Sequence, residues 1–355
     1  MSLYLPTAAD CFVYGTGARY NITDTRFRTK NISGSVKNTK TGSVIKKKCA
    51  VMYTAKRRIK MIQFLQALIS GLSLGSIYAL IALGYTMVYG IAKMLNFAHG
   101  DVIMIGAYSV IVSLTTLKLP GFAAVIVSIL FCAALGVTIE FLAYRPLRKS
   151  SPLAVLITAI GVSYFLQNIA LIIFGSTQMP FDKDKKVFNL PQVKLGPVEV
   201  NGITLLTLAV TAAIMIGLTI FINKTKIGKS MRAVSEDKEA AELMGISVNR
   251  TISITFAIGS ALAAIASIFY GGTYVYIKPT TGSMPGIKAF TAAVFGGIGS
   301  IPGAMLGGIL LGVIEQFAKT YISPLWSDAI VFAVLVVILV VKPTGLLGKK
   351  ISEKV

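Results

Sequence analysis

The sequence predicts an all-α polytopic membrane protein. Of its 355 residues, 54% are hydrophobic and only 14% are charged, whereas soluble domains carry about a quarter charged residues. From Met61 onward the chain is a succession of apolar stretches, and a helix of about 20 apolar residues crosses a bilayer. One such stretch could be a buried helix of a large soluble protein. Eight of them in succession exclude that class.

The apolar stretches define the expected spans, at 62–83, 84–117, 121–143, 152–174, 203–222, 251–271, 287–317 and 326–341. Two of them, 84–117 and 287–317, are interrupted, the first by a run of polar residues with one glycine and the second by a run rich in glycine. Counting each interrupted stretch as one element or two, we expect about eight to ten helices.

Residues 1–60 form a basic polar extension with 13 Lys and Arg against 2 acidic residues, so they hold more than half of the net charge of +21. They lack the apolar h-region of a signal peptide. We expect either a disordered tail or sequence translated ahead of a start at Met61. The alternative is a basic arm that binds anionic lipid through Lys46–Lys48 and Lys56–Lys60.

Few residues are suited to catalysis or to metal binding. His99 is the only histidine, and the three cysteines lie far apart with no CxxC spacing. These residues predict no metal site, no disulfide framework and no catalytic triad. We therefore expect neither catalytic residues nor an enzyme.

Charge bias predicts the sidedness of the spans, because cytoplasmic loops carry an excess of Lys and Arg. We expect four basic clusters in the cytoplasm: Lys56–Lys60, Arg145–Lys149, Lys224–Arg232, and Lys342 with Lys349–Lys350. The segment 175–202 is expected outside. The chain must then cross an odd number of times both from Lys60 to Pro120 and from Lys278 to Lys342. Each interrupted stretch is therefore expected to be a re-entrant element or a pair of short helices.

The two interruptions lie at Asn96–Asp101 and Phe295–Gly303. Non-helical backbone at membrane depth survives only where protein or water satisfies it, and broken helices point to a transport pathway. We expect a translocation path or a lock of the broken helix at these positions: Asn96, His99, Gly100, Asp101, Gly296, Gly297 and Gly299. Asp101 is alternatively a cap on the helix that follows. Glu140 and Glu315 are expected near helix ends, partly exposed or paired.

The loop 223–250 between two spans is expected to contain a short charged helix. Ser235 is a possible N-cap, and Gly245 fits the left-handed position that ends a helix. Ala240, Leu243 and Met244 form a small apolar face at helical spacing. Such a helix, too short to be stable alone, fits a partner's groove; the alternative is a solvated helix on the membrane surface.

Glu239-Ala240-Ala241 followed by Gly245 resembles the EAA loop of ABC-importer permeases. Residues 61–355 as a whole resemble the branched-chain amino-acid ABC transporter permeases, specifically the smaller of their two permease subunits, and residues 1–60 have no part in the resemblance. The sequences that carry it are Gly84–Gly90, Leu95–Asp101, Met104–Tyr108, Tyr144–Arg148, Arg232–Ile246, Val294–Ala304 and Lys342–Gly348.

This resemblance implies the ABC-importer permease fold in the cell (cytoplasmic) membrane. It implies a second homologous permease subunit, two cytoplasmic ABC ATPases and an extracytoplasmic substrate-binding protein as partners. The chain contains no GxxxxGK[ST], so it binds no cofactor itself and ATP is hydrolysed by the partner ATPases. The residues expected to couple to an ATPase are Arg232, Glu239, Ala240, Ala241, Leu243, Met244 and Gly245.

Branched-chain amino acids are the substrates that the resemblance implies. A permease for another small solute, such as urea or short-chain amides, stays open, because selectivity in such systems resides mostly in the binding protein. An ATP-independent secondary transporter is a further alternative, but the sequence offers few carboxylates for coupling. Nucleic acid is not expected as a partner, because the basic charge follows the loops.

Overall fold

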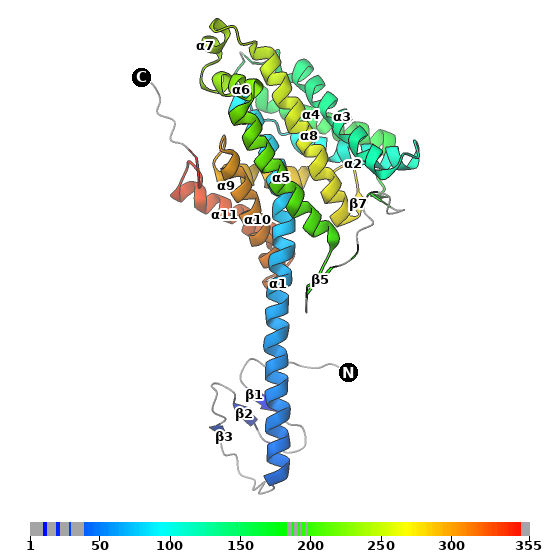
Figure 1. Cartoon of the computed structure of the whole chain (residues 1–355), viewed down its shortest axis with the longest axis vertical. Helices are drawn as coiled ribbons and strands as arrows, with labels where there is room; N and C mark the ends of the chain where they lie inside the picture. The colour runs from blue at the N-terminus through cyan, green and yellow to red at the C-terminus, as the bar shows by residue number, and fades with distance from the viewer. Residues whose placement is uncertain are drawn as a thin grey trace. The chain divides into compact units, whose positions relative to one another are not determined.

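The computed structural model describes residues 39–148, 150–182 and 198–348, with short stretches at 10–12, 19–21, 28–29, 187, 191 and 193–195 (Figure 1). The chain divides into two units, Met1–Phe64 and Leu65–Val355. Several residues used above lie outside the part whose side chains are described: Cys11, Lys46–Lys48, Cys49, Lys56, Arg57, Lys149, Lys349 and Lys350.

The first unit contains a small antiparallel sheet in the order β1 (Asp10–Phe12), β2 (Arg19–Asn21) and β3 (Arg28–Thr29). It also contains the first part of α1, which begins at Thr39, well before Met61. The described parts of the basic extension therefore have some secondary structure, and its contact with lipid stays a prediction.

The second unit is almost entirely helical. Its elements are the rest of α1 (Thr39–Ala92), α2 (His99–Thr115), α3 (Gly121–Ile139), the π-helix η1 (Glu140–Tyr144), α4 (Pro152–Phe174), α5 (Gly202–Lys224), α6 (Lys226–Glu236), α7 (Lys238–Leu243), α8 (Val248–Tyr274), α9 (Ser283–Gly296), α10 (Ile301–Tyr321) and α11 (Ser327–Val341). Two-stranded sheets pair β4 (Met179–Pro180) with β7 (Tyr276–Ile277), and β5 (Val193–Leu195) with β6 (Val198–Val200). Among the described residues, six helices are long and apolar enough to cross a membrane, and two further apolar helices, α2 and α11, are shorter. The prediction of an all-α polytopic membrane protein is confirmed.

The first interruption lies earlier than the sequence suggested. α1 continues without a break to Ala92, so 62–83 and the first part of 84–117 are one helix. Lys93 has a left-handed backbone with φ 57°, and α2 begins at His99. The first break is therefore Lys93–Ala98, and Gly100 and Asp101 belong to the first turn of α2.

The two ends of the Leu65–Val355 unit can be told apart. Figure 1 shows α6 and α7 at one end, here called the loop end, and β7 at the other, here called the sheet end. α8 joins them, because it begins at Val248 just after α7 and runs 27 residues, about 40 Å, to Tyr274 beside β7. Arg148 donates a hydrogen bond to Asn249, so the Arg145–Arg148 cluster also lies at the loop end.

The first span runs opposite to the expected direction. Ala92 lies at the loop end, where its carbonyl accepts a hydrogen bond from Lys238 Nζ at 2.9 Å. The part of α1 from Leu65 to Ala92 is about 40 Å long, so Leu65 lies at the sheet end. α2 returns toward that end, and α3 leaves it at Gly121.

Between Leu65 and Pro120 the chain therefore runs to the loop end and back, so the first span has the direction opposite to the one that the odd count required. The side on which Lys56–Lys60 lies stays a prediction, because these residues belong to the Met1–Phe64 unit. The physical reason is that charge bias fixes sidedness only where packing leaves the direction free. Here the backbone of Ala92 is tied to the opposite end.

The second interruption is a pair of helices, α9 and α10, joined by the second break, Gly297–Ser300. α10 runs antiparallel to α1, since Gly308 faces Ala79 and Gly312 faces Gly75. The C-terminal segment closes this break: Leu346 N donates to Phe295 O and Leu347 N to Gly296 O, both at 2.9 Å. Those carbonyls at the end of α9 have no helical partner, and the tail satisfies them.

The core of the second unit is formed by α1, α2 and α8, which are largely buried, while α3, α4 and α5 expose most of their surface. Exposed apolar side chains on the outer helices, such as Phe122, Phe165 and Ile172, fit contact with lipid. The two breaks adjoin the buried helices, which gives non-helical backbone the protein surroundings it requires.

Candidate functional site

The loop 223–250 folds as two consecutive helices rather than one. Thr225 caps α6 by accepting a hydrogen bond from Gly228 N at 3.0 Å. Asp237 caps α7, accepting from Glu239 N at 2.9 Å and Ala240 N at 3.0 Å. Each cap satisfies N–H groups that a helix start leaves free.

The expected N-cap, Ser235, is wrong. Ser235 lies in the last turn of α6, and its Oγ donates to the carbonyl of Arg232. Asp237 takes the cap because α6 occupies the residues before it, and its carboxylate is a good N-cap acceptor beside the positive helix start. The guanidinium of Arg232 folds back on Asn223.

The predicted apolar face of α7 is divided in the structure. Ala241 is buried against the bundle, while Ala240 and Glu239 are exposed. Leu243 is 89% exposed and Met244 82% exposed, although both are large and apolar. Gly245 follows with φ 81° and ends the helix as expected. The loop end therefore presents two apolar side chains to whatever lies beyond it.

The residues predicted at the first break are brought together and buried. Asn96 Oδ1 accepts a hydrogen bond from Tyr144 Oη at 2.8 Å. The ring of His99 packs edge-on against Tyr85, with centroids 4.7 Å apart. Asp101 is not the helix cap, since α2 begins after Ala98 without a side-chain cap.

Asp101 instead ties three helices together. Its carboxylate accepts hydrogen bonds from Ser163 and from Gln167 Nε2, both on α4. Gln167 Nε2 also donates to Ser283 Oγ at 3.1 Å, at the start of α9. A buried carboxylate is costly unless it is hydrogen-bonded, and here it holds the start of α2 to its neighbours.

The start of α9 lies directly against that of α2. A Cβ on Gly100 would lie 2.7 Å from Gly282 O, so only glycine permits this approach. Of the glycines predicted at the second break, Gly296 ends α9 and Gly297 has φ 104° against the tail at Gly348. Gly299 also has a positive φ, of 93°.

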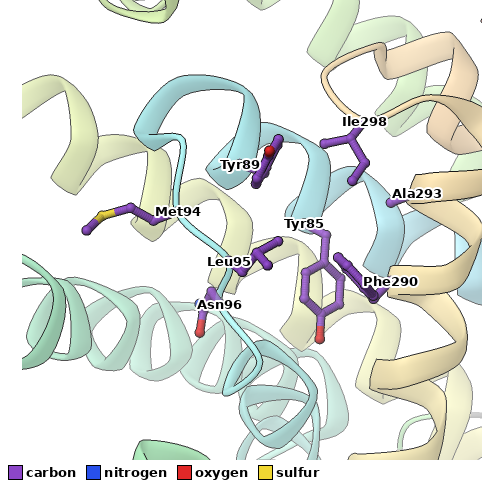
Figure 2. A pocket seen from close by; sticks show the side chains of 8 residues that line it. All are labelled: Tyr85, Tyr89, Met94, Leu95, Asn96, Phe290, Ala293 and Ile298. Carbon is purple, nitrogen blue, oxygen red and sulfur yellow. The ribbon is translucent and has the colours of Figure 1, made fainter. Parts of the chain in front are cut away.

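A small pocket of about 220 Å³, including its open mouth, lies between the two breaks. Figure 2 shows Tyr85 and Phe290 side by side in it. The lining residues are mostly apolar: Tyr85, Tyr89, Met94, Leu95, Asn96, Phe290, Ala293 and Ile298. Met94, Leu95 and Asn96 come from the first break and Ile298 from the second, so the two interruptions meet at one place.

Sequence reasoning missed Lys288, which is buried on α9. Its Nζ lies 2.8 Å from Glu315 Oε1 and 2.7 Å from Asp328 Oδ1. Glu315 also binds Lys319 at 2.6 Å and accepts a hydrogen bond from Tyr78 Oη. The available signal was a lysine one residue inside the apolar stretch 287–317, since such residues are usually paired.

Glu140 and Glu315 were expected to be either partly exposed or paired. Both are fully buried, and both are paired. Glu315 lies within α10 rather than at its end. Glu140 begins η1 and binds Arg148 and Ser253 Oγ, the latter at 2.6 Å. Full burial of a charge requires such partners.

Comparison with known proteins gives the family. The model of the family described as "Branched-chain amino acid transport system / permease component" matches residues 67–339. The chain belongs to this family. It is 45% identical over 307 residues to BraD of Pseudomonas aeruginosa, a high-affinity branched-chain amino acid transport system permease protein, covering 82% of this chain and 98% of BraD.

Two further members are similar over most of their length. LivH of Escherichia coli K12 is 44% identical over 309 residues, which is 83% of this chain and 99% of LivH. A probable LivH of Methanocaldococcus jannaschii is 30% identical over 294 residues, 77% of this chain and 89% of that protein. This permease is therefore a multi-pass membrane protein and a transport component.

Proposed function

We propose that this permease is the membrane-spanning subunit of an ATP-driven importer that carries branched-chain amino acids across the cytoplasmic membrane. A second homologous permease subunit, two cytoplasmic ATPases and an extracytoplasmic binding protein complete the importer. The chain itself binds no nucleotide and no cofactor. The relatives named for branched-chain amino acid transport, similar over nearly their whole length, support this proposal.

The exposure of Leu243 and Met244 carries the assignment of α7 as the ATPase docking helix. Two large apolar side chains, 89% and 82% exposed, lie at the end of a capped helix on a polar loop. Removing such side chains from water stabilises a complex by about 1.5–3 kcal/mol each. Arg232, Glu239 and Ala240 are also exposed on the same loop and complete the docking surface with Ala241 and Gly245.

The lining of the pocket between the breaks suits apolar groups, although in this structure the pocket has room for about one water molecule. Phe290, Leu95, Met94 and Ile298 offer apolar surface, and Asn96 is the only amide in the lining. A leucine side chain would gain free energy from such a surface in proportion to the area removed from water, in a conformation with a wider pocket.

Copurification tests the docking role. A tagged chain is extracted with its neighbours in mild detergent, and the ATP-hydrolysing subunits that come with it are quantified. We expect them with the wild type and with Leu325→Asp, which alters an apolar side chain 91% exposed between α10 and α11. We expect their loss with the double variant Leu243→Asp/Met244→Asp. Retention by that variant contradicts the proposal.

A further inference from the structure

We propose that Lys238 links the docking helix α7 to the first break, so that movement of α7 is passed to the pocket between the breaks. Lys238 is then a positioning residue for transport. This inference rests on the proposed docking of an ATPase at α7.

The link begins with one long-range contact. Lys238 Nζ donates a hydrogen bond of 2.9 Å to the carbonyl of Ala92, 146 residues earlier in the chain. Ala92 is the last residue of α1, and the carbonyls of a final helical turn have no partner within the helix. A lysine at this position also interacts favourably with the negative end of the helix dipole.

The contact lies directly before the first break, so a shift of Ala92 would move the start of the break. Ala92 is followed by Lys93, whose left-handed backbone turns the chain out of α1. A few residues later Asn96 is held by Tyr144 of η1. The break is therefore held at two points, by α7 at its beginning and by η1 near its end.

The segment between these two points forms one wall of the pocket. Met94, Leu95 and Asn96 line it opposite Phe290 and Ile298 (Figure 2). A displacement of Ala92 consequently changes the width of the pocket. Because α7 is a helix of six residues with a capped start, it moves as one piece when a partner pulls its exposed end.

Two neighbouring cations act against the positive charge of Lys238. Arg148 and Lys93 lie close enough to oppose the charge of Lys238, while the helix end attracts it. The contact therefore combines an attraction to the end of α1 with repulsion from two neighbouring cations. Arg148 is held in place by Glu140.

The first test separates docking from transmission. Wild type, Lys238→Met and Lys238→Arg are compared in the complete transport complex, with Lys229→Met as the matched control on the exposed side of α6. ATPase copurification, ATP hydrolysis and leucine uptake into proteoliposomes are measured together. We expect Lys238→Met to keep its ATPases and hydrolyse ATP but to lose uptake at least tenfold, and Lys238→Arg, which retains a donor, to recover it.

A second readout follows the break itself. Leu95→Cys is introduced after replacing the three natural cysteines, and its labelling by a maleimide is timed with and without ATP. The rate should respond to ATP in the wild type and stay constant with Lys238→Met. Equal responses, unchanged uptake, or loss of the ATPases with Lys238→Met overturn the inference. Absence of any ATP response in the wild type would instead contradict the proposed function.

Discussion

Gly100 and Gly282 bring the first turns of α2 and α9 into backbone contact: a Cβ on Gly282 would lie 2.0 Å from Gly100 O. α2 follows the first break and α9 precedes the second, and the two breaks are nearly 200 residues apart in the sequence. The contact between α2 and α9 and the pocket shared by the two breaks join the two breaks into one structural unit. In the sequence they are two separate features.

Gly100→Val should destabilise the permease, because its Cβ would lie 2.7 Å from Gly282 O and the backbone on both sides would have to shift. Overpacking of this kind costs about 1–3 kcal/mol. The melting temperature in detergent should fall by several degrees. Gly161→Val, on the exposed face of α4 with open space at its Cβ, should leave it unchanged; equal effects of the two variants would argue against the close contact.

Asp101→Ala should lower transport without releasing the ATPases. The substitution removes the acceptor for Ser163 and Gln167, and leaving buried donors unpaired costs about 1–3 kcal/mol. The start of α2 would then lose its hydrogen bonds to α4. Leucine uptake and ATPase copurification measure the two effects, with Asp101→Asn, which keeps one carbonyl oxygen, as the milder variant. Normal uptake by Asp101→Ala would count against a role as path or lock.

Lys288→Met should be among the most damaging single substitutions in α9. Glu315 would keep Lys319 and Tyr78 but lose its buried partner, and removal of one member of a buried pair costs about 3–5 kcal/mol. Replacing both residues, as Lys288→Met/Glu315→Met, should cost less than the sum of the single variants. Thermal unfolding of the four proteins measures the difference, and strictly additive losses would show that the pair does not interact.

The ammonium group of Lys238 should lose its proton more readily than an ordinary lysine. Burial lowers its pKa below the usual 10.5, and Arg148 and Lys93 lower it further. Since the charged form is disfavoured in the folded chain, this group adds to stability only as pH rises through its folded pKa toward 10.5. At pH values below the folded pKa of Lys238, its positive charge therefore destabilises the loop.

Lys93→Met removes one of those neighbouring charges and should raise the pKa of Lys238. The pH dependence of its acetylation by acetic anhydride, followed by mass spectrometry, measures this directly. The midpoint should move to higher pH in the variant. An unmoved midpoint would show that Lys93 does not act on Lys238.

The fold class followed from the sequence because each span is itself an apolar run. The existence of two breaks followed because glycine and polar residues interrupt such runs, but the first break begins three residues earlier than expected. The direction of the first span did not follow. It depends on how α1 packs within the bundle, where Gly308 faces Ala79 and Lys238 reaches Ala92, and such contacts between distant residues leave no local pattern. Statistical charge bias alone favoured the wrong end.

Some features of the candidate site could also be predicted from the sequence, and others could not. Gly245 could be predicted, because a helix stop is encoded locally in the backbone freedom of glycine. The pairing of Lys288 with Glu315 could not, since burial and partner depend on how α9 packs on α10. Ser235 and Asp237 are both good caps by residue type, and only the extent of α6 decides between them.

Leucine uptake into proteoliposomes containing the complete transport complex and its binding protein tests the central claim most directly. We expect uptake that requires ATP inside the vesicle, that is lost with Leu243→Asp/Met244→Asp, and that urea does not reduce. Uptake that continues without ATP, or that the double variant leaves unchanged, would contradict it.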